Sequence, residues 1–263
     1  MSSRAPLRVV CVGAFGRMGD RVRAAVAAAD DALLSGALEG PGHPRLGESI
    51  APGVHVVDDA DAALAGADVV IDFTVPRATC ATIRVAAERG VAYVCGTTGF
   101  SVSERAVLEA AAKQIPVVWS PNFSAAVNVL VHLVATAASL LPDTDAEIVE
   151  LHHAAKRDAP SGTALRLAEA IAAARGADLA QALVAARSGE TGARPSGAIG
   201  VQALRGGDNP GEHSVLFLGR GERLELTHRA TTRDHFAAGA VRAARWVVGR
   251  SAGLYGMEQV LGF

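Results

Sequence analysis

The sequence has few aromatic residues, few cysteines and no run of positive charge, and each shortage excludes a class of protein. Half of its 263 residues are hydrophobic but only 4% are aromatic, so Val, Leu, Ile and Ala must build the core, which suits helices on a parallel sheet. The net charge is −2 without a cluster of Lys or Arg, which argues against a nucleic-acid partner. Three scattered cysteines, Cys11, Cys80 and Cys95, indicate a reducing compartment rather than a disulfide framework.

Long uninterrupted hydrophobic segments are also absent, which argues against a membrane partner. The longest apolar stretch, 125–141, is interrupted by polar residues such as Asn128 and His132, and is shorter than the roughly 20 apolar residues that span a bilayer. We therefore expect a largely buried helix there. The N-terminal apolar stretch contains Arg8 and runs directly into a glycine motif, which predicts a strand rather than a signal peptide.

Strand-like and helix-like segments alternate through the first half of the chain. Helix-length stretches follow most of the short apolar runs, a spacing typical of βαβ units and a parallel sheet. Pro76 stands where a helix should begin and Gly90 where it should end. We expect an α/β, Rossmann-like doubly wound parallel sheet with strands at 7–12, 33–39, 54–57, 68–73, 91–95 and 116–119, and helices at 17–29, 60–65, 77–89 and 102–113.

The pattern changes after the apolar stretch at 125–141. Successive strands without intervening helices indicate a mixed or antiparallel sheet, and hence a second, α+β domain. We expect strands at 145–152, 198–205, 213–218 and 223–229, helices at 161–174 and 233–250, and loops at 40–53 and 188–196. The first domain is predicted to comprise residues 1–124 and 233–263, and the second 125–232.

A glycine motif follows the first predicted strand directly. Gly13-Ala14-Phe15-Gly16-Arg17-Met18-Gly19 stands between a strand and a helix, the context in which such a motif indicates dinucleotide binding. Glycine permits a tight turn and lets backbone N–H groups approach a pyrophosphate, while the helix N-terminus adds partial positive charge. The spacing is Gly-x-x-Gly-x-x-Gly, because Phe15 holds the middle position. The alternative is a glycine-rich turn that binds no ligand.

An acidic residue, Glu39, ends the second predicted strand, where a carboxylate can accept hydrogen bonds from the adenosine ribose hydroxyls. Gly40 and Pro41 follow it, so no base stands beside it to pair with a 2′-phosphate. The sequence therefore predicts a preference for NADH over NADPH, which Arg17 and Arg45 nearby would weaken. The alternative is an ordinary acid at a strand end.

Three further strand ends carry polar or small residues and should line the same crevice, at the carboxyl edge of the sheet. Gly96 would let the backbone pass close to a ligand, and the hydroxyls of Thr97 and Thr98 could bond to ribose or carboxamide. Thr74 has an alternative role as a helix cap ahead of Pro76. The segments are Asp72-Phe73-Thr74, Gly96-Thr97-Thr98-Gly99 and Ser120-Pro121-Asn122-Phe123.

The densest polar stretch is 150–165, Glu-Leu-His-His-Ala-Ala-Lys-Arg-Asp-Ala-Pro-Ser-Gly-Thr-Ala-Leu. A predicted strand delivers His152 and His153 to its end, a polar loop holds Lys156, and Gly162 and Thr163 open a helix. Hydride addition to an unsaturated, nitrogen-containing acceptor creates negative charge that needs a proton, which an imidazole or an ammonium can give. A carboxylated substrate also needs positive charge and N–H groups, which Lys156 and the helix start offer.

Lysine usage points to the same loop, since Lys113 and Lys156 are the only lysines among 25 basic residues. A lysine in a chain that otherwise uses Arg indicates that a compact ammonium able to lose a proton is required. The alternatives are a solvated Lys156 and two structural histidines. A metal site is not expected, because His152 and His153 would point to opposite faces of a strand and no Cys or acid cluster completes a zinc set.

Together these motifs resemble the 4-hydroxy-tetrahydrodipicolinate reductase (dihydrodipicolinate reductase) family of the diaminopimelate route to lysine, over nearly the whole chain. The most specific match is 150–165, and 13–19, 96–99, 122–124, 211–215 and 228–233 also match. The resemblance implies a cytoplasmic homotetramer, assembled through the sheets of the second domain, that reduces a cyclic dicarboxylate with NADH or NADPH. It makes the first domain dinucleotide-binding, and the second the domain of substrate binding and oligomerisation.

The same resemblance implies roles for individual residues. His152 and Lys156 match catalytic proton donors or acceptors, and His153, Gly162 and Thr163 match contacts to the substrate carboxylates. Gly40 is a departure, because many members of the family place a base there, and it puts recognition of a 2′-phosphate in doubt. The implied nucleotide contacts are Gly13, Ala14, Phe15, Gly16, Arg17, Met18, Glu39, Gly96, Thr97, Thr98, Ser120, Pro121, Asn122 and Phe123.

Two other functions fit parts of the sequence. Another two-domain NAD(P) dehydrogenase, acting on a small amino or keto acid, would share the glycine motif but would not require the His-His-x-x-Lys loop. A non-catalytic NAD-binding sensor would need the glycine motif and could dispense with Lys156. Activity with a dicarboxylate, and its dependence on Lys156, would separate these functions.

Overall fold

The computed structural model describes residues 5–263, so the first four residues of the expected first domain lie outside the described part. The chain divides into two compact units. One comprises the residues up to Ala125 together with Asp234–Phe263, and the other is Ala126–Arg233. Each break lies one residue from the expected boundary. Between residues 5 and 263 we find no helix that combines the length and the hydrophobicity of a membrane span.

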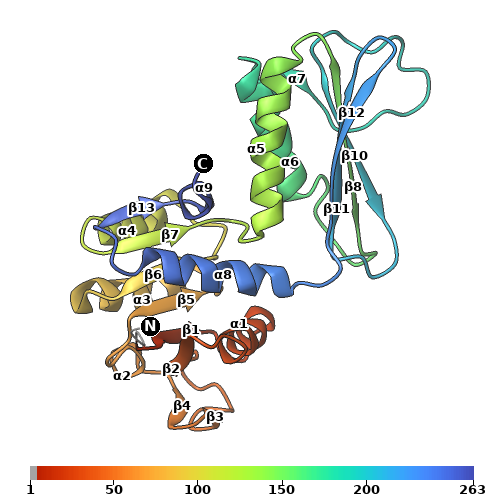
Figure 1. The fold of residues 1–263 in the computed structure, drawn as a ribbon. Coiled ribbons are helices and arrows are strands. Elements are labelled where there is room, and N and C mark those ends of the chain that lie inside the picture. The colour runs from red at the N-terminus through yellow and green to blue at the C-terminus, as the bar shows by residue number, and fades with distance from the viewer. Residues whose placement is uncertain (1–4) are drawn as a thin grey trace. The chain divides into compact units, whose positions relative to one another are not determined.

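The first unit is built on an eight-stranded sheet of order β13-β7-β6-β5-β1-β2-β4-β3 (Figure 1). All neighbouring strands are parallel except the β3–β4 pair at one edge. The apolar runs of β1 and β5 are buried on both faces, as central strands of a parallel sheet require. The strands are β1 (Leu7–Val12), β2 (Ala32–Leu38), β3 (Ser49–Ala51), β4 (Val54–Val57), β5 (Val69–Asp72), β6 (Ala92–Cys95), β7 (Pro116–Trp119) and β13 (Gly253–Tyr255).

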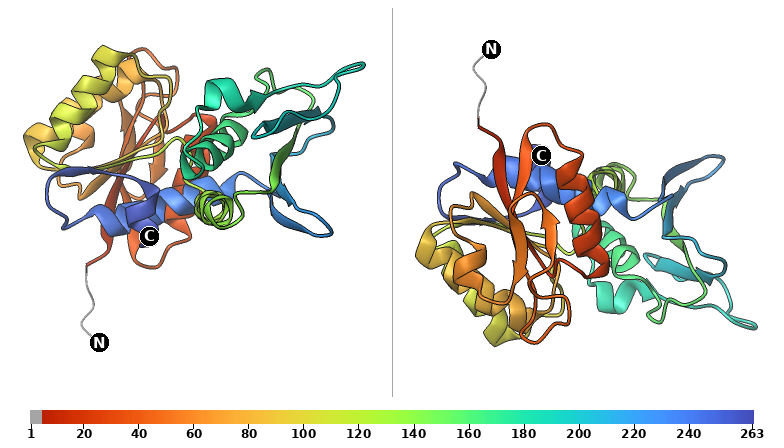
Figure 2. Two further views of the ribbon diagram at one scale, coloured as in Figure 1. Left: turned by 90° about the horizontal axis from the view of Figure 1, so that it is seen from above. Right: turned by 90° about the horizontal axis from the view of Figure 1, so that it is seen from below.

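Helices cover both faces of this sheet, each with its own hydrophobic core (Figures 1 and 2). One face packs against α1 (Arg17–Ala27), α8 (Asp234–Val247) and α9 (Met257–Leu261), and the other against α2 (Ala60–Ala63), α3 (Pro76–Arg89) and α4 (Val102–Ala112). The doubly wound prediction is confirmed. Because β2 and β5 lie on opposite sides of β1, the carboxyl ends of β1 and β5 flank a topological switch point, where such sheets bind ligands.

Three short elements of this unit depart from the sequence-based expectations. β3 lies inside 40–53, and the prediction of a loop there is wrong at Ser49–Ala51 because antiparallel pairing with β4 orders the segment. β13 and α9 follow the last long helix, where no element is predicted, and β13 extends the sheet by pairing with β7. A strand of three residues is too short to show the alternation by which a sequence reveals strands.

The second unit packs two helices on one face of a five-stranded mixed sheet of order β12-β11-β8-β10-β9 (Figure 1). The central strand β8 (Asp145–His152) is antiparallel to β11 (Glu212–Leu218) and parallel to β10 (Ile199–Arg205). Alternate residues of β8 are buried, and the core lies beneath α5 (Ala125–Leu140) and α6 (Gly162–Ala174). The other elements are α7 (Leu179–Ala182) and β9 (Leu183–Val184), which were not expected, and β12 (Arg223–Arg229).

Helix α5 is less buried than its composition predicts. Leu130 and Val134 belong to the core, but Val129, Leu133 and Leu140 are 40%, 46% and 73% exposed. The prediction of a largely buried helix is therefore wrong for this face, because only one stripe of α5 packs in the core.

Candidate functional site

The glycine motif forms the turn between β1 and α1. Gly13 has a φ of 69°, a left-handed conformation that glycine adopts readily, and a Cβ there would lie 2.7 Å from Cγ2 of Thr74. A Cβ at Gly19 would overlap the carbonyl oxygen of Gly13. Helix α1 begins after Gly16 without a side-chain cap, so its N-terminal N–H groups can receive an anion.

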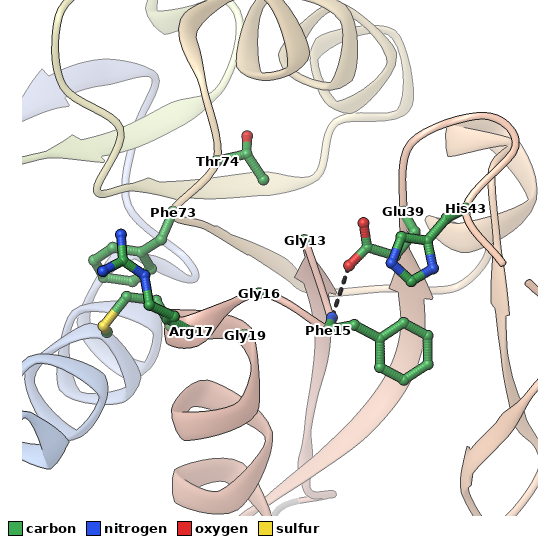
Figure 3. Close-up of a pocket in the computed structure, with 10 residues that line it drawn as sticks. Gly13, Phe15, Gly16, Arg17, Gly19, Glu39, His43, Phe73 and Thr74 are labelled. Atoms are coloured by element: carbon green, nitrogen blue, oxygen red, sulfur yellow. Dashed lines mark hydrogen bonds between the residues drawn. The ribbon is translucent and has the colours of Figure 1, made fainter. Parts of the chain in front are cut away.

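A cavity of about 310 Å³ lies at this turn (Figure 3). Glu39, directly after β2, lines it and accepts a hydrogen bond from the backbone N–H of Phe15 at 2.7 Å. Ala14 is a predicted contact that does not line the cavity, and it is fully buried. The predicted contacts that do line it are Gly13, Phe15, Gly16, Arg17, Met18 and Glu39, joined by Gly19, His43, Phe73 and Thr74.

Phe15 forms one wall of this cavity together with the loop that follows β2. Its ring stacks on His43, with 5.3 Å between the ring centroids, and the Arg45 guanidinium lies 3.6 Å from its centroid. The Glu48 carboxylate accepts hydrogen bonds from Arg45 at 2.7 and 2.6 Å. These bonds hold the pKa of Glu48 below its usual range, so its negative charge balances Arg45 beside the ring.

Asp72, at the end of β5, is fully buried and organises the adjoining strand ends. Its carboxylate accepts hydrogen bonds from the Tyr93 hydroxyl at 2.6 Å and from the hydroxyl and N–H of Thr74 at 2.6 and 2.8 Å. Thr74 is therefore held at the cavity. The alternative role of Thr74 as the cap of α3 is wrong, because the N-cap is Val75 and no side chain caps that helix.

None of the predicted contacts at the ends of β6 and β7 lines the cavity at Glu39. The Thr97 hydroxyl is buried and accepts a hydrogen bond from Thr79 at 2.8 Å, and the Ser120 hydroxyl donates to the Asn122 carbonyl at 2.8 Å. Phe123 is fully buried. These three side chains therefore shape the loops, whereas the other predicted contacts are half-buried or exposed: Gly96, Thr98, Pro121 and Asn122.

A second polar cluster lies in the other unit, around Glu150. This side chain is fully buried, and its carboxylate accepts hydrogen bonds from Arg205 at 2.8 and 2.8 Å and from the Ser161 N–H at 3.0 Å. Nδ1 of His152 lies 2.5 Å from Oε2 of Glu150. Burial alone would raise the pKa of Glu150, but these hydrogen bonds lower it below the usual range, so the group is a carboxylate.

His152 and His213 lie side by side in this cluster, with 5.2 Å between the ring centroids. His152 is 8% exposed, and burial lowers its pKa more than the bond to Glu150 raises it. Burial also lowers the pKa of His213, to about 3, so His213 is neutral and its Nε2 lies 3.1 Å from the Ser161 hydroxyl. His152 is thus the titratable histidine of the pair nearer to neutral pH.

The two adjacent histidines have separate surroundings. His152 bonds to Glu150, whereas Nε2 of His153 lies 3.2 Å from Nη2 of Arg233. In the part of the chain that the structure describes, no three His, Cys, Asp or Glu side chains gather in a way that could hold a metal ion.

The predicted loop residues lie between β8 and α6. The Lys156 ammonium donates two hydrogen bonds to Asp158, both 2.9 Å, and its side chain is 20% exposed. Helix α6 begins after Ser161, whose hydroxyl accepts a hydrogen bond from the Ala164 N–H at 3.1 Å. Gly162 and Thr163 therefore form the first turn of this helix.

Strand pairing adds residues that the sequence does not predict. Arg205 on β10 pairs with His152, and His213 on β11 pairs with Glu150. His213 and Arg233 lie in segments that match the family, 211–215 and 228–233, but their neighbours in the chain do not reveal these contacts, and Arg205 lies outside the matched segments. Glu150 could have been found, since a residue two positions before His152 on a strand shares its face.

Two family models together match almost the whole chain. The model for "Dihydrodipicolinate reductase, N-terminus" matches residues 7–123, and the one for "Dihydrodipicolinate reductase, C-terminus" matches residues 126–261.

Curated relatives cover the full length. A protein of Anaeromyxobacter sp. (strain Fw109-5) named 4-hydroxy-tetrahydrodipicolinate reductase is 56% identical over 262 residues, which cover 97% of this chain and 98% of the relative. A protein of the same name from Nitrosomonas europaea is 46% identical over 264 residues, covering 98% of both. The solved structure of "Dipicolinate bound Dihydrodipicolinate reductase from Paenisporosarcina sp. TG-14" shares the fold, with a TM-score of 0.81, 24% identity, and coverage of 97% of this chain and 99% of that one.

Proposed function

We propose a function from the premise that the chain belongs to the dihydrodipicolinate reductase family. The protein catalyses the NAD(P)H-dependent reduction of 4-hydroxy-tetrahydrodipicolinate (dihydrodipicolinate) to tetrahydrodipicolinate, in the diaminopimelate route to lysine. The observation that carries this proposal is the cluster of His152, Lys156 and the start of α6, which offers proton donors and an anion-binding helix terminus in one unit. Another NAD(P) dehydrogenase acting on a small amino or keto acid and a non-catalytic NAD-binding sensor are set aside, because neither accounts for full-length relatives of this name.

The glycine turn fits a nicotinamide dinucleotide. A Cβ at Gly13 would press on the Thr74 side chain and one at Gly19 on the backbone of Gly13, and α1 begins without a side-chain cap. We propose that residues 13–18 hold the pyrophosphate and that Glu39 accepts hydrogen bonds from the adenosine ribose. When bound, the cofactor supplies the hydride. We also propose that residues 96–98 and 120–123 contact the nucleotide.

NADH is the proposed preferred cofactor. Glu39 places a carboxylate in the cavity, where it would repel a 2′-phosphate. The nearest guanidinium to the Phe15 wall, Arg45, already bonds to Glu48, so its charge is balanced. Equal or higher kcat/KM with NADPH would contradict this preference.

His152 and Lys156 are the proposed proton carriers. The substrate gains negative charge when it is reduced and must take up a proton, which Nε2 of a protonated His152 or the ammonium of Lys156 can give. His153 lies beside the Arg233 guanidinium, and Gly162 and Thr163 open α6, so these residues are placed to bind carboxylates. The dicarboxylate occupies the second unit in this proposal.

A coupled assay tests the function directly. The purified chain should oxidise NADH in the presence of the condensation product of pyruvate and aspartate semialdehyde, and it should show no such activity with simple keto acids. Equal rates with simple keto acids, or no oxidation with the cyclic dicarboxylate, would overturn the proposal. The same assay with NADPH measures the cofactor preference.

We further propose that the enzyme is a cytoplasmic homotetramer. Cys11, Cys80 and Cys95 are buried, unpaired thiols, and burial raises the pKa of Cys11 to about 12, which suits a reducing compartment. Microscopy of a fluorescently tagged chain in its own host would test the location. The four copies are proposed to associate through the sheet of the second unit.

A further inference from the structure

Glu150 is a charged side chain without solvent exposure. Oε1 accepts from the Ser161 N–H at 3.0 Å and from Nη2 of Arg205 at 2.8 Å, while Oε2 accepts from Nη1 of Arg205 at 2.8 Å and lies 2.5 Å from Nδ1 of His152. Two strands and the residue before α6 therefore meet on one carboxylate. Burying an ion is costly even when it is paired, and apolar residues of similar size often serve stability as well. Stability alone does not explain a carboxylate at this position.

The first consequence of Glu150 concerns the imidazole of His152. A carboxylate can only accept a hydrogen bond, so Nδ1 of His152 carries the hydrogen. In the neutral ring the lone pair then lies on Nε2, the atom that faces Gly211, where a Cβ would come within 2.8 Å. Nε2 is therefore the atom that takes up or releases a proton.

The charged and titratable groups facing this ring come from four places. Glu150 lies on the same strand, Arg205 on β10, His213 on β11, and Lys156 in the loop that follows β8. Arg205, Lys156 and a protonated His213 disfavour the imidazolium, and Glu150 favours it. Glu150 is thus the only one of these four groups that stabilises the protonated ring.

The second consequence concerns the N-terminus of α6. Ser161, the N-cap, donates its N–H to Glu150, accepts from the Ala164 N–H through its hydroxyl, and contacts His213 with the same hydroxyl. This fixes the entry into the turn of Gly162 and Thr163 relative to β8. The proton-carrying imidazole and the proposed carboxylate-binding turn are consequently tied to the same side chain.

We propose that Glu150 is a positioning residue for the reduction: it fixes the His152 imidazole in one tautomer and holds the first turn of α6 at a set place beside it. This inference rests on the proposed function, because that function gives both groups their roles. Glu150 is fully buried and both of its carboxylate oxygens accept hydrogen bonds from protein donors, so it acts through His152 and α6.

The same strand provides a matched control. Glu147 also lies on β8 and also binds arginines, with hydrogen bonds from Arg187 at 2.8 and 2.8 Å and from Arg194 at 2.9 Å. It lies three positions before Glu150, so it points to the opposite face of the sheet, and its bonds involve no histidine. Glu147→Gln therefore removes a comparable carboxylate on β8 without touching His152 or α6.

The test compares Glu150→Gln with Glu147→Gln in the full-length enzyme. For Glu150→Gln we expect kcat to fall by at least about tenfold, because the imidazole loses the group that fixes its tautomer. The limb of the pH profile set by His152 should move to lower pH, since the group that favours the imidazolium has lost its charge. KM for the dicarboxylate should rise, because the first turn of α6 is no longer held in place, and the Kd for NADH should not change. Glu147→Gln should leave kcat, KM for the dicarboxylate and the pH profile unchanged.

Two outcomes of these kinetics would overturn the proposal. One is wild-type kcat, KM and pH profile in Glu150→Gln. The other is the same change of pH profile in Glu147→Gln, which would mean that any ion pair lost from β8 has this effect. Either outcome would refute the role of Glu150 without contradicting the reductase activity of the wild-type enzyme. Failure of this proposal can therefore be distinguished from failure of the proposed function.

A measurement on the wild-type chain covers the case in which Glu150→Gln does not fold. Imidazole nitrogen NMR, with His152 assigned by its loss in His152→Gln, should show the neutral ring protonated at Nδ1. A neutral ring protonated at Nε2 would overturn the proposal. This measurement needs no turnover, so it tests whether Glu150 fixes the tautomer of His152 even if the dicarboxylate assay shows no activity.

Discussion

Lys156 is one of two lysines in the chain, and it lies in the loop that joins β8 to α6. Asp158 orients its ammonium through two hydrogen bonds of 2.9 Å. We predict that Lys156→Ala lowers kcat by roughly two orders of magnitude or more, because the reaction loses an acid–base group. The Kd for NADH should stay the same, because Lys156 and the glycine turn belong to different units. Steady-state kinetics and cofactor fluorescence titration measure both.

Lys113, which ends α4, is the natural control for this variant. Lys113→Ala should leave kcat and KM unchanged, since its side chain is exposed on the first unit. Unchanged turnover in Lys156→Ala would remove Lys156 from the proposed proton carriers.

His213 gives the stability of the second unit a defined pH dependence. Its pKa is about 6.5 in the unfolded chain and is lowered by burial to about 3 in the folded one. Between these values the unfolded state binds the additional proton, so the free energy of unfolding falls as the pH drops, with a limiting slope of about 1.4 kcal/mol per pH unit. We predict that His213→Gln is less sensitive to acid in this window. Amide hydrogen exchange of β8 and β11 across pH measures the free energy of opening.

The exposed His132 on α5 provides the comparison. His132→Gln should keep the wild-type slope between the two pKa values. A slope in His213→Gln equal to that of the wild type would show that His213 does not carry the acid sensitivity. The lowered pKa of His152 acts in the same direction and should persist in both variants.

At the level of single residues, the sequence predicts site residues that lie close together in the chain. His152, His153, Lys156 and Gly162 stand within eleven positions, so their chemistry can be recognised together. Arg205 meets Glu150 only because β10 pairs in register with β8. The position of Thr97 at a strand end predicts a contact to the cofactor, but its buried hydroxyl accepts a hydrogen bond from another residue of the protein. The sequence does not reveal this internal partner.

At the scale of elements, the loop between β2 and β3 connects a charge pair to the cavity at Glu39, the proposed cofactor site. Arg45 lies over the Phe15 ring and bonds to Glu48, which neutralises it. We predict that Glu48→Gln increases NADPH use relative to NADH by roughly two- to fivefold, because an unbalanced guanidinium beside the cavity favours a 2′-phosphate. The ratio of kcat/KM for the two cofactors is the quantity to measure.

Helix α4 supplies a matched control for this loop. Glu109 bonds to Arg105, which lies over the Trp119 ring, so the same three kinds of group recur away from the cavity. Glu109→Gln should leave the cofactor ratio unchanged. An unchanged ratio in Glu48→Gln would show that Arg45 does not reach the adenosine end of the cofactor.

Elements with a clear period are those that the sequence predicts well. The apolar runs of β1 and β5 and the alternation along β8 give their positions to within a residue or two. β3 and β13 escape prediction because three residues show no period, and their order comes from pairing with β4 and β7. The exposed stripe of α5 escapes for another reason: composition shows how apolar a helix is, but not how many of its faces are covered.

At the scale of the whole molecule, the sheet of the second unit presents a face without helices. α5 and α6 pack against Ile148, Val215 and their neighbours, so the alternate residues of the same strands face the other side. These include Val149, Leu151, Leu204, Leu216 and Leu218, and Leu204 is 51% exposed. Grouped apolar side chains on a sheet face favour association with another surface, which supports the proposed assembly through this sheet.

A charge placed in the middle of this face should prevent assembly while preserving the fold. Leu216 lies in the middle of β11 and on the face away from the helices, so Leu216→Lys changes no residue of the core and should leave the single chain folded. We predict that the wild type sediments as four copies of the 26.8-kDa chain and that Leu216→Lys gives smaller species. Leu133→Lys, on the exposed stripe of α5, should keep the wild-type mass. If Leu216→Lys remained tetrameric and Leu133→Lys did not, the contacts that hold the copies together would lie on α5. Leu216→Lys should disrupt a sheet interface because a lysine buried there would lose its hydration without a compensating partner from the second copy.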